Sequence, residues 1–116
     1  MPKIEAGSLY GTLNLLILQC LAEEDPLHGL GIARRIHDVT REVLRIEEGA
    51  LYPALHRLER DGLLRSQWGI SDQNRRAKLY ELTPNGQTYL DEEVEKWARH
   101  TEAVSRVLGE AVEGSA

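Results

Sequence analysis

The chain has 116 residues, of which 41% are hydrophobic and 28% are charged, and its formal net charge is −5. A chain of this length predicts one domain with a modest core, and the composition is too apolar for a disordered protein. No stretch approaches the roughly 18 consecutive apolar residues of a membrane-spanning helix, and no basic segment precedes an apolar run at the N-terminus. We therefore expect a cytoplasmic protein without membrane contact.

The charge is distributed unevenly along the chain. Residues 1–27 carry one basic and four acidic side chains, residues 28–83 ten basic and eight acidic, and residues 84–116 three basic and seven acidic. The middle segment is therefore locally basic although the whole chain is acidic. Because salt confines the influence of a charge to about 10 Å, the overall sign does not exclude binding to nucleic acid.

The N-terminal part of the sequence predicts two helices. The first spans about Leu9 to Ala22, and its stripe of leucines and isoleucines suits a helix that is buried on most of its surface. It contains the single cysteine, Cys20, which we interpret as a core residue. Pro26 ends this segment, and a second helix fits roughly residues 28–41. Its predicted inward side chains are those of Leu30, Ala33, Ile36 and Val39.

The stretch EEGALYPALHRLERDGLL predicts a third helix with two different faces. Leucines recur at i, i+4 and i+7 and form one apolar ridge. Pro53 belongs in a first turn, so the helix should begin near Gly49 to Leu51, and Gly62 should end it. The side away from the leucines carries Gly49, Pro53, His56, Arg57 and Arg60, with Tyr52 at its flank.

A β-hairpin should follow directly. LLRSQWGI and AKLYELT both alternate at period two, with Leu64, Trp68 and Ile70 on one face of the first strand, and a polar turn joins them. Thr83 and Pro84 then form a good start for a helix of about residues 84–111, with threonine as the cap and proline in the first turn.

This last helix carries an apolar seam spaced alternately by four and three residues, which is the heptad pattern of a coiled coil. In so small a protein the seam has no partner left within the chain, so we expect a second copy related by two-fold symmetry. The predicted dimer interface consists of Leu90, Val94, Trp97, Thr101, Val104, Leu108 and Ala111.

The order of helix, helix, helix, hairpin and long helix predicts a mainly α fold with a small β-hairpin. It is typical of a winged helix-turn-helix followed by a C-terminal dimerisation helix. We expect a DNA-binding domain over residues 1–83, with its wing at about 71–76, a dimerisation helix over 84–112 and a frayed tail at 113–116. In such proteins one helix lies in the major groove and the hairpin reaches the neighbouring backbone.

The predicted DNA-binding residues have side chains that suit this task. Gly49 and Ala50 are small enough for close approach, and free N–H groups there can bind phosphate. The other candidates on this helix are Tyr52, Pro53, His56, Arg57 and Arg60, and the hairpin adds a basic cluster of Arg75, Arg76 and Lys78.

Simpler interpretations remain open for several of these residues. Tyr52 could pack on Leu55 or on the wing, Arg57 and Arg60 could be solvated or ion-paired, and Arg75 with Arg76 could form an ordinary polar turn. Arg34 and Arg35 fit a solvated face, although one of them could hold a phosphate.

Five stretches resemble the PadR-type transcriptional regulators: GTLNLLIL, PLHGLGIARRI, EEGALYPALHRLERDGLL, NRRAKLYELTPNG and the charged C-terminal helix with its tryptophan. The resemblance covers about residues 9–110 and is closest to the short subfamily with a single C-terminal helix. It implies a winged-helix homodimer that represses by occupying a palindromic operator on double-stranded DNA. It also implies release by a small aromatic or hydrophobic effector near the dimer interface.

Carried over residue by residue, the resemblance places the groove helix on 49–60, with Tyr52 and His56 facing DNA. His28 opens the second helix near the DNA backbone, and Trp97 is the candidate effector-binding residue. The chain departs from the pattern at Leu30, where many relatives have an aromatic residue.

Three other classes of protein fit the sequence less well. An enzyme is disfavoured because the histidines are scattered, Cys20 lacks an activating base and no glycine-rich phosphate loop follows a strand. We expect neither catalytic residues nor a cofactor. A metal-sensing repressor needs clusters of cysteine and histidine, so we expect no metal. A winged-helix module for protein contacts, with weak or lost DNA binding, is favoured by Glu47, Glu48 and the net charge; a salt titration would distinguish it.

Overall fold

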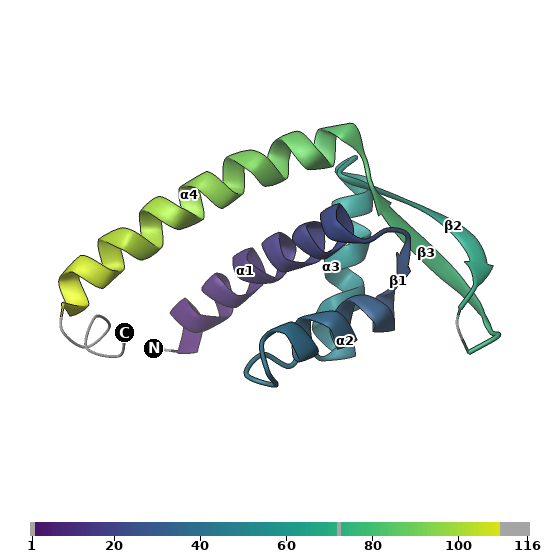
Figure 1. Ribbon diagram of the computed structural model, residues 1–116, viewed down its shortest axis with the longest axis horizontal. Coiled ribbons are helices and arrows are strands. Elements are labelled where there is room, and N and C mark those ends of the chain that lie inside the picture. Colours follow the sequence, from purple (N-terminus) through teal and green to yellow (C-terminus); the bar gives the residue numbers. More distant parts are fainter. Residues whose placement is uncertain (1, 72, 110–116) are drawn as a thin grey trace.

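A computed structural model describes the backbone of residues 2–71 and 73–109, and the side chains from residue 12 onwards in these ranges. The elements follow one another in the predicted order, with one short strand added (Figure 1). They are α1 (Pro2–Glu23), β1 (Leu27–His28), α2 (Gly29–Val39), α3 (Glu48–Arg60), β2 (Leu64–Ile70), β3 (Arg76–Leu82) and α4 (Pro84–Leu108). This arrangement confirms the predicted mainly α fold with a hairpin and a long last helix.

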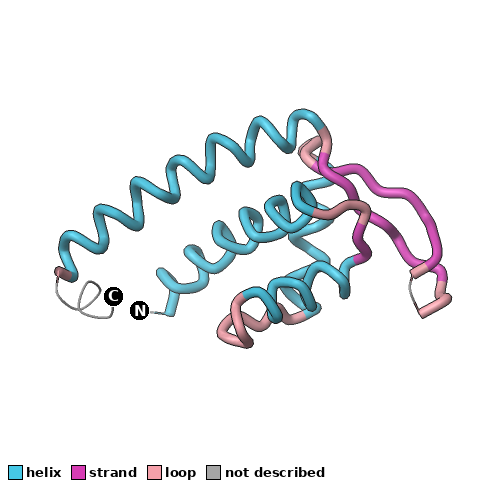
Figure 2. The backbone as a smooth tube through the Cα atoms, in the orientation of Figure 1, coloured by secondary structure: helices cyan, strands magenta, loops and turns pink. Residues whose placement is uncertain are grey.

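The molecule is elongated, with principal extents of 49 × 28 × 27 Å. Figure 1 shows α1, α2 and α3 as one helical body, while α4 leaves the sheet and runs back alongside α1. The hairpin of β2 and β3 projects from the other end of this body (Figure 2). The two projecting parts, hairpin and α4, therefore leave the core in different directions. Among the described residues, no helix is both long and apolar enough to cross a membrane.

The core is built mainly from the apolar faces of α1 and α3. The leucine ridge of α3 is confirmed, since all of its members are buried. The predicted inward face of α2 is partly wrong: Ile32 and Ile36 are buried, whereas Leu30 is 39% exposed and Val39 lies on the surface. The fully buried large side chains are Leu13, Ile17, Leu18, Leu21, Ile32, Leu51, Leu55, Tyr80 and Leu90.

The sheet has the order β1-β3-β2. The strands β2 and β3 pair antiparallel from Leu64 with Leu82 to Ile70 with Arg76, as the alternating pattern predicted. The strand β1 was not predicted, because two residues give no periodicity to detect. It pairs with β3 through His28 and Leu79, and so brings the start of α2 against the hairpin.

Helix ends differ from the predictions at several positions. The helix α1 begins at Pro2 and α3 begins at Glu48, so Pro53 lies in the second turn of α3 and not in the first. The helix α4 ends at Leu108, and the predicted seam residue Ala111 and the tail 113–116 lie outside the described residues.

The predicted cap of α4 is confirmed. The Thr83 hydroxyl accepts a hydrogen bond from Gly86 N at 3.0 Å and donates one to Gly62 O at 2.7 Å. The backbone N–H of Thr83 donates to Leu63 O at 3.1 Å. These bonds fix the first turn of α4 to the loop that follows α3.

Candidate nucleic-acid interface

The helix α3 turns its leucine ridge inward, so its opposite side faces solvent. Gly49, Pro53, His56 and Arg60 are exposed, and Ala50, Tyr52 and Arg57 are partly buried. Every residue that the sequence placed on the outer side of this helix therefore keeps some exposed surface. This side of α3 has the length and the small N-terminal residues needed to enter a groove of DNA.

A groove of 380 Å³ lies between the start of α2, the outer side of α3 and the wing hairpin. It brings together predicted DNA-binding residues from three elements, and Leu30 and Trp68, which were not predicted to bind DNA, also line it. The predicted residues along it are His28, Tyr52, His56, Arg75, Arg76 and Lys78. Gly49, Ala50, Pro53, Arg57 and Arg60 do not line it.

Tyr52 owes its position to Gly29. A methyl group on Gly29 would lie 2.8 Å from Cε1 of the Tyr52 ring, so only glycine leaves the ring in place without a shift. The ring also packs against the core, so part of the Tyr52 side chain has a packing role, as the alternative interpretation of this residue predicted. Burial, and to a smaller extent the Glu48 carboxylate, raises the pKa of the Tyr52 hydroxyl. The group therefore stays protonated at neutral pH and can donate a hydrogen bond.

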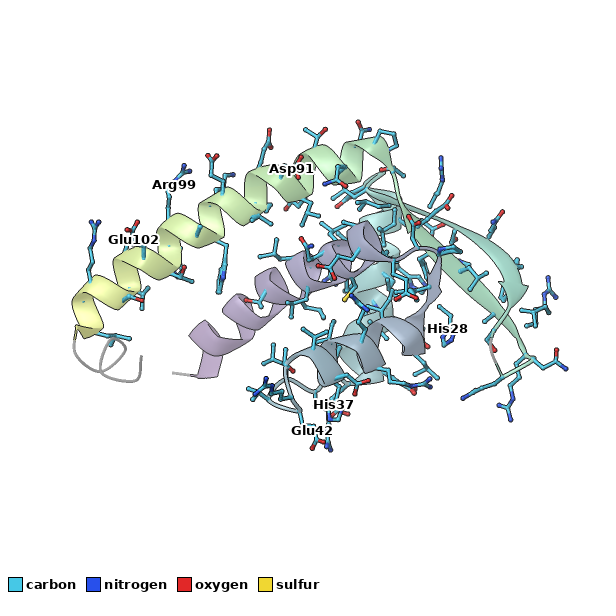
Figure 3. The ribbon with its side chains drawn as sticks, viewed as in Figure 1. His28, His37, Glu42, Asp91, Arg99 and Glu102 are labelled. Atoms are coloured by element: carbon cyan, nitrogen blue, oxygen red, sulfur yellow. The ribbon has the colours of Figure 1, made fainter. Side chains whose placement is uncertain are left out.

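His28 caps a helix in addition to lining the groove. It is the N-cap of α2, and its Nδ1 accepts a hydrogen bond from Gly31 N at 3.1 Å. The cap holds the imidazole at the start of α2, on the side toward the hairpin (Figure 3). The ring is thus fixed in orientation before any ligand arrives.

The wing holds its arginines in two different ways. The Arg76 guanidinium lies 4.6 Å from the centre of the Trp68 ring, a cation–π contact that orders the side chain. Trp68 is 59% exposed and Ile70 is 63% exposed, whereas Leu64 is buried, so only the start of the face that these three residues share packs on the core. Arg75 is exposed beside a tight turn, in which Ser71 N donates to Arg75 O at 2.7 Å.

Ion pairs divide the predicted basic residues into two groups. Lys78 lies 3.8 Å from Glu59, and Arg60 lies 4.0 Å from Asp61. In the described ranges, Arg57, Arg75 and Arg76 have no carboxylate within ion-pair distance. Exposed ion pairs contribute little to stability, so Lys78 and Arg60 can exchange their partners for phosphate, but the unpaired arginines need no exchange.

The sequence model of the transcriptional regulator PadR-like family matches residues 17–92, a segment that contains α2, α3 and the whole hairpin. The chain belongs to the PadR-like family of transcriptional regulators. PadR regulators bind DNA, and they are not enzymes.

Relatives of this PadR-like chain include both sequences and solved structures. The transcriptional regulator Rv3488 of Mycobacterium tuberculosis is 38% identical over 72 residues, which are 62% of this chain and 64% of that protein. A transcriptional regulator from Clostridium thermocellum has a TM-score of 0.79 at 28% identity, with 89% of this chain and 96% of that chain covered. A PadR-like transcription factor from Bacteroides fragilis has a TM-score of 0.72 at 30% identity, with 90% and 98% covered.

The seam of α4 is exposed over most of its length in this PadR-like protein. Trp97 is 44% exposed, and Val94, Val104 and Leu108 are also on the surface. Leu90 is an exception and corrects the prediction, because it is 2% exposed and packs within the core of its own chain. It therefore has no surface to offer to a partner. Thr101 turns its hydroxyl to the carbonyl oxygen of Trp97 at 3.0 Å.

A cavity of 290 Å³ lies between α1 and α4. Leu15, Tyr89 and Trp97 supply apolar walls, and the His100 ring lies 5.8 Å from the Trp97 ring. Asn14 also lines the cavity, and its Oδ1 is buried without a hydrogen bond in the described part of the chain. The cavity thus combines aromatic surface with an unused polar acceptor.

Cys20 should be unreactive in the folded protein. It is 8% exposed, and burial raises the pKa of its thiol to about 11. The reactive thiolate is therefore almost absent at neutral pH. Iodoacetamide should label Cys20 slowly in native protein and quickly in denaturant, as followed by mass spectrometry. Fast native labelling would contradict the buried placement.

Proposed function

We propose that this PadR-like protein is a transcriptional repressor that binds a palindromic operator as a homodimer, with residues 1–83 contacting DNA and 84–112 joining the two copies. The observation that carries this proposal is the groove that α2, α3 and the wing form together. Donors from all three elements converge there, and Arg75 and Arg76 have no carboxylate partner among the residues that the structure describes. A phosphate backbone is the ligand that such a surface fits best.

Each element contributes to the proposed complex in its own way. The small residues Gly49 and Ala50 with Pro53 let α3 approach the base edges, where His56 and Arg57 are donors. Glu47 and Glu48 occupy the N-terminal end of α3, so their negative charge opposes a phosphate at that end. Phosphate contacts therefore come mainly from the wing and from His28 and Tyr52.

The proposed dimer interface is the exposed part of the α4 seam. Val94, Trp97, Thr101, Val104 and Leu108 continue the heptad spacing along one side of the helix. In contrast, Arg99 projects from the side of α4 that faces away from α1, where charged residues prevail (Figure 3). A second copy would remove the apolar row from water, which is the usual driving force for such pairing.

Selection of bound fragments from the host genome, followed by footprinting of one fragment, tests the proposal. Two protected half-sites should be centred roughly 34–36 Å apart, and the mass in solution should be that of two chains. Binding should fall steeply as salt rises, because each neutralised phosphate adds close to one unit to the salt slope. A monomer, or binding that does not respond to salt, would favour the protein-contact module.

The cavity between α1 and α4 is the proposed site for a small aromatic effector. Tyr89 and Trp97 can stack on a planar ring, and the cavity lies beside the proposed interface. Ligand binding there could change how the two copies are held on DNA.

Replacing Trp97 with alanine should therefore impair the response to an effector more than it impairs DNA binding. The measurement is release of the footprinted fragment by a panel of planar aromatic compounds, for the parent and for Trp97→Ala. Tyr89→Phe, which keeps the ring, is the matched control and should respond like the parent. Equal responses of parent and Trp97→Ala to a working compound would remove Trp97 from the site.

A further inference from the structure

The arginines without a carboxylate partner are not confined to α3 and the wing. Within the part of the chain that the structure describes, Arg34, Arg41 and Arg45 are also exposed and lack an ion pair. They lie on α2 and on the loop between α2 and α3. The neighbouring Arg35, in contrast, is held by Glu23 at 2.7 Å and by Glu24 at 3.3 Å. Ion pairing thus separates two adjacent arginines that the sequence could not tell apart.

Two of these arginines border a second groove, of 280 Å³. Its apolar residues are Leu30, Ala33 and Ile46, and its charged or titratable residues are Arg34, His37 and Arg45. No acidic side chain is among the described residues that line it. Apolar surface can hold the stems of the arginines while their guanidinium groups stay in water. The groove is therefore suited to an anion that arrives from solvent.

The second groove continues the first along α2. Leu30 lines both of them, and the first groove takes in the start of α2 while the second follows the helix toward His37. Figure 3 shows His28 and His37 at the two ends of this helix. A duplex seated on the wing and α3 would thus pass over Arg34, in the middle of α2, and over Arg45, on the loop that follows α2.

The loop before α3 holds Arg45 in place. The Thr40 hydroxyl donates to Ile36 O at 2.8 Å and accepts from Leu44 N at 3.1 Å, and Glu42 N donates to His37 O at 2.8 Å. Arg41 and Glu42 adopt positive φ values of 53° and 68°, so the chain turns tightly there. A loop fixed by these bonds presents Arg45 with little loss of conformational freedom on binding.

We propose that Arg34 and Arg45 form a second phosphate-binding site, which holds the backbone of the same duplex along the second half of α2 and the loop that follows it. This inference rests on the proposed function. Arginine suits the task because its planar fork can donate two hydrogen bonds to one phosphate. The site also places positive charge beside Glu47 and Glu48, which would otherwise repel DNA from the start of α3. Contacts at both ends of α2 would fix the orientation of α3 in the groove.

The test measures the salt dependence of binding to a fluorescently labelled duplex of mixed sequence. Arg34→Ala with Arg45→Ala should lower the salt slope by roughly one to two units, and should weaken binding roughly ten-fold per lost contact near 0.1 M salt. Arg34→Lys with Arg45→Lys keeps both charges and should retain most of the slope. The thermal melting temperature should stay that of the parent, because neither arginine has a hydrogen-bond or ion-pair partner within the described ranges.

The control removes two arginines far from both grooves. Arg99→Ala with Arg106→Ala breaks exposed pairs with Glu95 and Glu102 on α4 and should leave the slope unchanged. If the parent binds with a steep slope and the Arg34, Arg45 double variant gives the same slope, the second site is refuted and the proposed function stands. If the parent itself binds no duplex, the proposed function fails, and this inference falls with it.

Discussion

Replacing both wing arginines, Arg75→Ala with Arg76→Ala, should weaken DNA binding for all sequences alike and lower the salt slope by roughly one to two units. Phosphate contacts carry little sequence information, so specific and mixed-sequence duplexes should lose affinity together. Near 0.1 M salt the expected loss is roughly ten-fold for each contact. Fluorescence anisotropy over a series of salt concentrations measures both quantities.

The contact between Arg76 and Trp68 allows a second variant that tests the wing without removing its charge. Arg76 is ordered by the Trp68 ring at 4.6 Å, so Trp68→Leu should weaken binding while keeping the charge and most of the salt slope. Arg65→Ala is the matched control, because Arg65 lies on the same hairpin, is exposed and pairs with Glu81. It should behave as the parent does. An unchanged slope for the Arg75, Arg76 variant would mean that the wing does not touch phosphate.

Gly86→Ala should lower the free energy of unfolding by about 1–3 kcal/mol. Inside a helix this substitution usually stabilises, because alanine has the higher helix propensity. At Gly86, however, the added methyl would overlap the carbonyl oxygen of Leu63 and lie 2.8 Å from Leu82 Cδ1. The carbonyl belongs to the backbone, and it already accepts the Thr83 N–H, so it cannot move aside freely.

Thermal unfolding followed by circular dichroism measures this effect. For a chain of this size, each 1 kcal/mol should shift the melting temperature by roughly 4 °C. Gly49→Ala is the matched control, since Gly49 also lies in a helix, but among the described residues nothing beyond its chain neighbours and its own helix backbone comes within 4 Å of the added methyl. It should be as stable as the parent or slightly more so. A Gly86→Ala protein that melts with the parent would refute the close contact.

The sequence predicted the elements well because their signals are local. Periods of 3.6 and 2 residues located the helices and both hairpin strands, and Thr83 with Pro84 marked the start of α4. The helix boundaries were predicted less accurately, since Pro53 lies in the second turn of α3 and not in the first. The strand β1 depends on pairing with Tyr80 and Leu79 of β3, and no local sequence pattern predicts pairing with residues so far along the chain.

The candidate site could be predicted by residue type but not by environment. The sequence could not show that Lys78 pairs with Glu59, nor that Arg34 has no ion pair among the described residues, because tertiary contacts decide which carboxylates come within reach. Leu90 fitted the seam by spacing, but its position near the start of α4 puts it in the core. Trp68 lies close in sequence to the basic turn, which was a signal that its ring lines the groove beside the wing and is not part of the core.

The hydroxyl of Thr83 joins the recognition half of the molecule to the long tail helix through Gly62 O and Gly86 N, without a flexible linker between them. In the proposed dimer, the distance between the two α3 helices would therefore depend on the angle at this rigid junction between α3 and α4. Inserting a single base pair at the centre of the operator would rotate one half-site by roughly 34° about the duplex axis. A rigid junction would not let one α3 helix follow that rotation, so we expect the protein to bind operators with a longer spacer more weakly.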